Sequence, residues 1–313
     1  MSYRIQPFET LPLKHYFMFG QVMQKPEICQ LFLEELFGWD IEKIEYVDRE
    51  KDITDSYWGH GIRLDIYIRN SGKVYNIEMQ AEKEDALERR IRFYQSGIDR
   101  EELRSGIHYS HLPDTFIIFI CDYDPIGLGN AHYERQTYWK YASHPCSDGT
   151  HAILLNSRYT TGNASPAILE FLDYVRTNDD TAEYSSSLAK QAKAQVQRVR
   201  LDKEVGGQYM LLEQKIQDTL AKGERIGLEK GERIGLEKGE RIGLEKGERI
   251  GLEKGDMVRL ITMVTKKLAK GKSIDVIADE LEEDSSVIEA ICKVVETFDS
   301  DYDPSEIYEV LKK

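Results

Sequence analysis

Residues 62–80 read Ile-Arg-Leu-Asp-Ile-Tyr-Ile-Arg-Asn-Ser-Gly-Lys-Val-Tyr-Asn-Ile-Glu-Met-Gln, and this stretch predicts a β-hairpin. Two runs of alternating apolar and polar residues flank Asn70-Ser71-Gly72, which is typical of a hairpin turn. Because side chains alternate between the two faces of a strand, each run has an apolar and a polar face. The apolar residues are Leu64, Ile66, Ile68, Tyr75, Ile77 and Met79, and the polar ones are Arg63, Asp65, Tyr67, Asn76, Glu78 and Gln80. The alternation therefore predicts that Asp65, Glu78 and Gln80 converge on the polar face.

Two carboxylates held close together repel each other unless a cation compensates their charge. Mg²⁺ accepts carboxylate, carbonyl and water oxygens, so Asp65, Glu78 and a carbonyl near Met79 would suit it. The ion would polarise a phosphate and activate a water, and Gln80 would orient that water or the phosphate. The simpler alternative is a hairpin whose polar face only meets solvent, as antiparallel hairpins commonly do.

The surrounding sequence predicts an α/β fold. Helices are expected at 27–37, ended by Gly38, and at 86–97, where Arg90 and Tyr94 share one face. Strands are expected at 43–47, in the apolar run 115–121 and at 152–155. This order predicts a mixed sheet flanked by helices, followed by a helical C-terminal extension.

Three parts follow one another along the chain: a first domain at 1–205, a repeat-containing helical spacer at 206–255, and a small helical, helix-turn-helix-like tail at 256–313. The sequence Gly-Glu-Arg-Ile-Gly-Leu-Glu-Lys occurs four times between Gly223 and Lys254. Glycine disfavours a helix by about 1 kcal/mol per residue, whereas Glu–Arg pairs four residues apart favour one. We expect a marginal helical spacer, and the alternative is a rod through which the chain forms a homo-oligomer.

Composition limits the function. Hydrophobic residues make up 41% of the 313 residues, enough for a sizeable core. The net charge of -14 argues against a protein that coats DNA, but not against a nuclease whose acids hold metal or lie away from the DNA. No apolar run reaches the roughly 18 residues of a membrane span, and no signal peptide opens the sequence. We therefore expect a cytoplasmic protein with no membrane partner, whose four cysteines are free thiols.

Four blocks, taken in order, resemble the recombination-promoting nuclease and transposase family of the PD-(D/E)XK nuclease superfamily. They are Phe17-Met18-Phe19-Gly20-Gln21-Val22-Met23, Gly61-Ile62-Arg63-Leu64-Asp65, Val74-Tyr75-Asn76-Ile77-Glu78-Met79-Gln80 and Arg92-Phe93-Tyr94-Gln95-Ser96. The likeness extends over roughly residues 5–300. It implies a restriction-endonuclease-like fold and Mg²⁺-dependent cleavage of DNA, the partner. It also implies that Asp65 and Glu78 are metal ligands and that Gln80 replaces the superfamily's catalytic lysine.

The sequence departs at three places from the pattern of the superfamily or of the family, although glutamine at position 80 is usual for the family. Leu64 stands where a proline is usual, and Gln80 cannot supply the positive charge of a lysine. His15-Tyr16 stands where relatives usually carry two acids, so we expect a greater need for Mg²⁺ or a preference for Mn²⁺. Two hypotheses follow: a Mg²⁺-dependent DNA endonuclease of transposase type, or the same fold with a weakened site, acting as a DNA- or protein-binding interaction protein.

Overall fold

A computed structural model describes residues 5–44, 47–53, 61–103, 105–141, 143–298 and 303–312. The chain forms two compact units, Met1–Gln217 and Asp218–Lys313.

The first unit is built on a mixed six-stranded sheet with the strand order β1-β2-β3-β4-β8-β5. The strands are β1 (Asp48–Ile53), β2 (Ile62–Asn70), β3 (Lys73–Gln80), β4 (Asp114–Cys121), β5 (His132–Arg135) and β8 (Thr150–Asn156). β4 pairs in parallel with both β3 and β8, and the other pairs are antiparallel. A small separate sheet consists of β6 (Tyr138–Trp139) and β7 (His144–Pro145). The predicted mixed sheet is therefore confirmed.

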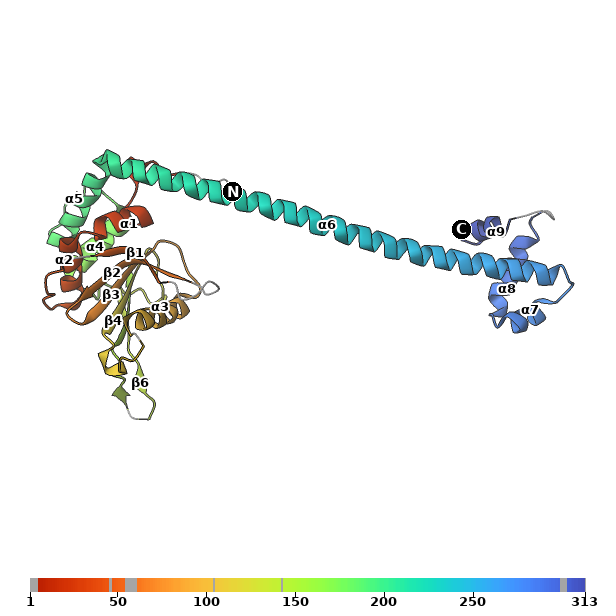
Figure 1. The fold of residues 1–313 in the computed structure, drawn as a ribbon, viewed down its shortest axis with the longest axis horizontal. Helices are drawn as coiled ribbons and strands as arrows, with labels where there is room; N and C mark the ends of the chain where they lie inside the picture. The colour runs from red at the N-terminus through yellow and green to blue at the C-terminus, as the bar shows by residue number, and fades with distance from the viewer. Residues whose placement is uncertain are drawn as a thin grey trace. The chain divides into compact units, whose positions relative to one another are not determined.

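Helices cover both faces of this sheet (Figure 1). They are α1 (Tyr16–Met23), α2 (Pro26–Phe37), α3 (Leu87–Glu102), α4 (Pro166–Thr177) and α5 (Ser187–Leu201), with short 3-10 helices at Phe8–Thr10 and Tyr109–His111. One hydrophobic cluster lies between the sheet and α1, α2, α4 and α5, and a second lies between the sheet and α3. Gly38 ends α2 in a left-handed conformation with φ 73°, as predicted. The fold is consistent with a restriction-endonuclease-like α/β fold.

The strand predicted at 43–47 is wrong. Lys43, Ile44 and Val47 lie outside any strand, residues 45 and 46 lie outside the described residues, and the first strand is β1, five residues further on. Ile44 and Val47 are buried, but in an irregular segment against the first cluster. β1 is instead a charged edge strand, since its sequence Asp-Arg-Glu-Lys-Asp-Ile has little apolar character and its main chain is held by β2.

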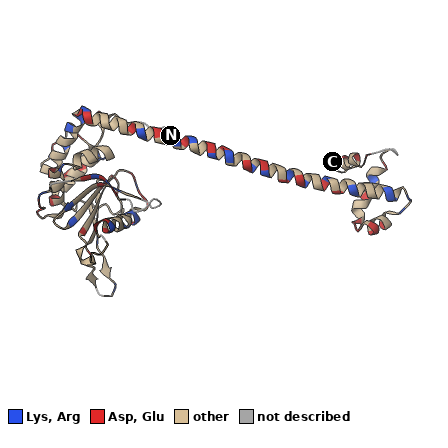
Figure 2. Cartoon of the chain, in the orientation of Figure 1, with Lys and Arg blue, Asp and Glu red and all other residues tan. Residues whose placement is uncertain are grey.

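The second unit contains most of the long helix α6 (Lys203–Leu268), followed by α7 (Ile274–Leu281), α8 (Ser285–Val295) and α9 (Pro304–Leu311). A third hydrophobic cluster joins the end of α6 to these three helices. The repeat lies within α6, where its isoleucines and leucines are exposed and acids and bases are interspersed (Figure 2). No helix in the described part of the chain is both long and apolar enough to span a membrane.

Candidate active site

The two predicted acids meet where β2 separates from β3. Main-chain pairing between these strands reaches Ile66 opposite Ile77, and Asp65 and Glu78 come next in that register. Side chains replace the ladder here: the Asp65 N–H donates to Glu78 Oε1 at 3.1 Å, and the Met79 N–H donates to Asp65 Oδ2 at 3.1 Å. Each carboxylate therefore uses one oxygen to hold the other acid's strand in place.

The face that carries these acids is not a solvent-facing surface. Glu78 is 1% exposed and Asn76 is fully buried, because α3 covers this side of the sheet. The alternative of a hairpin whose polar residues only meet solvent is therefore wrong for Glu78. Burying an ionisable group in this way is costly unless it is paired or neutralised.

β2 changes faces at Asp65, which the alternation did not predict. Ile66 and Ile68 pack in the first cluster as expected, but Leu64 packs in the second cluster, under α3. Pairing with β3 ends at this point, and on the other side Glu50, which falls opposite Asp65 in the β1 register, has a positive φ of 57°. The ladder with β3 ends here and the ladder with β1 omits the Glu50–Asp65 position before it resumes, so a strict period of two fails across Asp65.

Arg90 of α3 brings a positive charge to the acids. Its guanidinium donates to Gln80 Oε1 at 2.8 Å and to Glu78 Oε2 at 3.3 Å, and its Nε donates to the Tyr94 hydroxyl at 2.8 Å. The guanidinium also lies over the Phe119 ring at 5.3 Å. Arg90 thus contacts Glu78 and Gln80 at once, and the helical spacing of Arg90 and Tyr94 was the sequence signal for it.

The electrostatics of the pair favour a bound cation or a retained proton. Burial, followed by repulsion from Asp65, raises the pKa of Glu78 to about 8. Burial also raises the pKa of Asp65, although the Met79 N–H and Arg90 act in the opposite direction. One guanidinium, itself partly exposed, therefore only partly compensates the buried carboxylate of Glu78 and the half-buried carboxylate of Asp65.

The donor set fits a hard divalent ion. Among the described residues, no group of three or more His, Cys, Asp and Glu side chains is arranged to hold a metal. Mg²⁺ is usually bound by one or two carboxylates together with waters and substrate phosphates, so three protein side chains are not required. Asp65 and Glu78 offer oxygen ligands alone, and an ion between them would relieve the repulsion that raises the pKa of Glu78.

His15 and Tyr16 adopt two different local roles. His15 precedes α1, and its Nδ1 accepts from the Phe17 N–H at 3.3 Å, so the ring caps the helix. The Tyr16 hydroxyl donates to Glu213 Oε1 of α6 at 2.9 Å. Glu213 is 1% exposed, and no local pattern in the sequence pointed to it. Glu213 thus brings a carboxylate next to Tyr16, although it lies nearly two hundred residues further along the chain.

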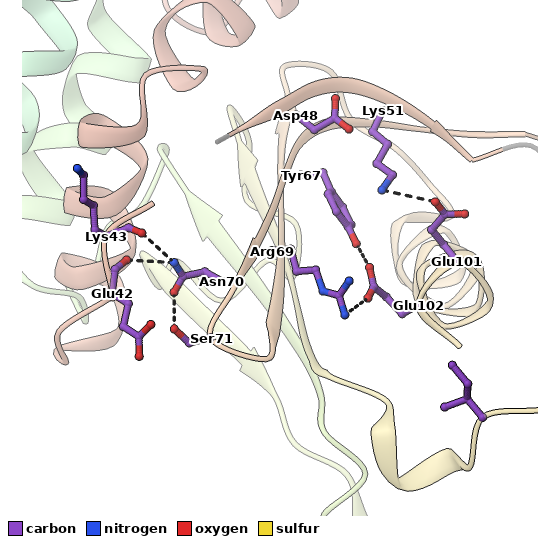
Figure 3. Close-up of a pocket in the computed structure, with 11 residues that line it drawn as sticks. Glu42, Lys43, Asp48, Lys51, Tyr67, Arg69, Asn70, Ser71, Glu101 and Glu102 are labelled. Carbon is purple, nitrogen blue, oxygen red and sulfur yellow. Dashed lines mark hydrogen bonds and ion pairs between the residues drawn. The ribbon is translucent and has the colours of Figure 1, made fainter. Parts of the chain in front are cut away.

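A separate cleft of about 840 Å³ is lined by Tyr67 and by the C-terminal end of α3 (Figure 3). The Tyr67 hydroxyl donates to Glu102, and Arg69 pairs with the same carboxylate at 3.2 Å. Lys51 pairs with Glu101 at 3.6 Å. These contacts fix the C-terminal turn of α3 to β1 and β2, and so hold the helix that carries Arg90.

Comparisons with curated proteins and with solved structures gave no significant match. A family model described as PD-(D/E)XK nuclease family transposase matches residues 15–137. This range is narrower than the likeness expected from the four blocks, but it contains α1, β1 to β4 and α3, and with them the acid pair and Arg90. Residues 15–137 of the chain are therefore similar to the PD-(D/E)XK nuclease family transposases, a family of nucleases.

Proposed function

We propose that the protein is a divalent-metal-dependent DNA endonuclease of transposase type, which hydrolyses phosphodiester bonds at Asp65 and Glu78. The observation that carries this proposal is the pair formed by the buried Glu78 and the half-buried Asp65, in which each carboxylate accepts a main-chain N–H from the other acid's strand. The similarity of residues 15–137 to a family of nuclease transposases supports it independently.

In this proposal Asp65 and Glu78 hold Mg²⁺, or Mn²⁺, with the oxygens that do not accept the main-chain N–H groups. The ion would polarise the scissile phosphate and lower the pKa of the attacking water. Gln80 orients that water or the phosphate: its Oε1 accepts from Arg90 and keeps a second lone pair, while its amide donates to the Glu82 carbonyl at 2.8 Å. Arg90 supplies, through these contacts, the positive charge that a lysine at position 80 would have given.

The test is nicking of supercoiled plasmid in Mg²⁺ and in Mn²⁺, with a chelator as the blank. Asp65→Asn and Glu78→Gln should each reduce the rate at least 100-fold, because a carboxylate ligand is lost. Amide replacements are preferable to alanine, since Glu78 is buried and alanine would leave a cavity and an unpaired Asp65 N–H. Glu170→Gln, which removes an acid of α4, serves as the matched control. Equal nicking by wild type and both site variants would disprove the proposal.

Self-association through the C-terminal helical region is a second, separate proposal. Its support is the exposure of eight isoleucine and leucine side chains along the repeat, each at least 38% exposed. Light scattering of the full chain and of a chain lacking the repeat would test it. The same number of chains per particle in both would exclude the repeat as the contact.

A further inference from the structure

A small cavity of about 270 Å³ lies beside Asp65, among residues of α1, β1, β2 and α6. It is lined by Tyr16, Gly20, Arg49, Glu50, Arg63, Asp65, Leu212 and Ile216. Two of these residues are arginines, one from β1 and one from β2. Both pair with the same carboxylate: Arg63 lies 2.5 Å and Arg49 3.4 Å from Glu50. The lining thus carries two arginines and two acids, Glu50 and Asp65, and both arginines face the first of these acids.

Arg49 packs against α1, over the Phe17 ring and close to Gly20. Its guanidinium carbon lies 5.1 Å from the centre of the Phe17 ring. A Cβ at Gly20 would come within 2.6 Å of Arg49 Nε and 3.1 Å of its Cδ, so any larger residue at position 20 displaces the arginine. Gly20 has an ordinary helical position, where alanine would otherwise be preferred. The glycine is therefore explained by the arginine that passes over it.

The strained backbone at Glu50 belongs to the same arrangement. A non-glycine residue at φ 57° is disfavoured, and such residues persist where the surrounding contacts hold them. Here the two arginines hold the Glu50 carboxylate, which also raises the pKa of Asp65 by its negative charge. The side chains of Arg49, Glu50 and Arg63 are 19%, 32% and 60% exposed, so a ligand can reach all three.

We propose that Arg49 and Arg63 form a binding site for a backbone phosphate of DNA next to Asp65, with Glu50 occupying the arginines until the phosphate replaces it. This inference rests on the proposed function and adds the residues that place the substrate. Arginine suits the role because its planar guanidinium pairs with phosphate through two hydrogen bonds. The competing explanation is a structural ion-pair cluster that only joins β1 to β2.

The experiment measures binding of the full-length protein to a fluorescently labelled DNA duplex in chelator, where no cleavage occurs, over a range of salt concentrations. Each phosphate contact contributes about 0.9 to the slope of log affinity against log salt. Arg49→Gln and Arg63→Gln should each lower that slope by about 0.9 and weaken binding about eightfold at 0.1 M salt. Arg176→Gln, which removes an arginine paired with Asp173 on α4, should change neither quantity.

Glu50→Gln separates the two explanations, because it should strengthen binding once both arginines are released. A structural cluster predicts the opposite pattern: lower melting temperatures for the arginine variants, unchanged salt slopes, and no gain in affinity for Glu50→Gln. That result, or a wild-type protein that does not bind DNA, would overturn the proposal. Salt slopes that change as expected in a protein that never cleaves DNA would instead overturn the endonuclease proposal alone.

Gly20→Ala tests whether the packing of Arg49 against α1 matters for DNA binding. It should weaken DNA binding as much as Arg49→Gln does, and the double variant should be no weaker than either single variant. Effects that add in the double variant would show that Gly20 acts independently of Arg49.

Discussion

Replacing Glu78 by glutamine should stabilise the first unit, and increasingly so as the pH rises. Glu78 is almost fully buried, and its pKa is raised from an ordinary value near 4.5 to about 8. Between these two pH values the folded protein holds a proton on this carboxyl that the unfolded chain has lost. The free energy of unfolding of the wild type therefore falls as the pH rises through this window, by up to about 1.4 kcal/mol per pH unit.

Glutamine removes this dependence while keeping the shape of the side chain. Its Oε1 can still accept from the Asp65 N–H, the contact now made at 3.1 Å. Because Asp65 shares the proton, part of the slope remains, and the expected gain of the variant between pH 5 and pH 8.5 is on the order of 2–4 kcal/mol.

Urea denaturation in chelator, followed by tryptophan fluorescence, gives this difference directly. Trp39, Trp58 and Trp139, the three tryptophans of the chain, all belong to the first unit, so the signal does not report on the second. Curves of unfolding free energy against pH that run parallel for wild type and Glu78→Gln would show that the buried carboxyl does not hold the proton.

Glu170 supplies a control, because its pKa is lowered whereas that of Glu78 is raised. Burial opposes ionisation of its carboxyl, but hydrogen bonds from Ser185 and Ser186 outweigh burial and lower its pKa to about 2. The stability that Glu170 contributes is present above the unfolded pKa and is lost only as the pH falls through the folded one. The difference between wild type and Glu170→Gln should therefore be flat from pH 5 to pH 8.5.

Three further outcomes are expected. Arg90→Met removes the guanidinium that favours the ionised form of Glu78. The acidic limb of the curve of cleavage rate against pH should therefore move to higher pH, with roughly tenfold less cleavage at pH 7. An unmoved limb would contradict this. Deleting one or two eight-residue units between Gly223 and Lys254 should change the cleavage rate less than about twofold, since a Cβ at the repeat glycines would meet nothing, and a tenfold loss would show a role in catalysis. A chain ending at residue 205 should unfold more readily than one ending at 217 by about 3–5 kcal/mol, because it lacks the fully buried Tyr209, and equal urea midpoints would disprove this.

The hairpin was predictable because its determinants are local. Ser71 and Gly72 have positive φ values of 49° and 74°, which the turn sequence anticipates. The apolar run at 115–121 forms the central strand β4, buried on both faces, as its composition indicates. In these elements the residues that decide the structure are neighbours in sequence, so pattern alone was sufficient.

Features that depend on partners elsewhere in the chain were not predictable in the same way. β1 is charged, and it is a strand because β2 offers its main chain. Glu78 is buried because α3 lies over this face of the sheet, which alternation cannot distinguish from a polar face in water. The face change at Asp65 coincides with the end of pairing with β3 and with the one position, Glu50–Asp65, that the β1 register omits, and the sequence of β2 alone contains neither.

The pair His15-Tyr16 shows how such distant partners alter an interpretation made from sequence. Its lack of acids led us to expect a greater need for Mg²⁺, because relatives usually carry two carboxylates there. Tyr16 instead donates a hydrogen bond to the buried carboxylate of Glu213, which a carboxylate at position 16 would repel. The Glu213 charge also opposes the effect of burial, which lowers the pKa of His15. One acid, Glu213 of α6, thus lies beside positions 15 and 16, and its carboxylate accepts a hydrogen bond from the Tyr16 hydroxyl. The neutral residues at 15 and 16 are therefore not, by themselves, a reason to regard the site as weakened.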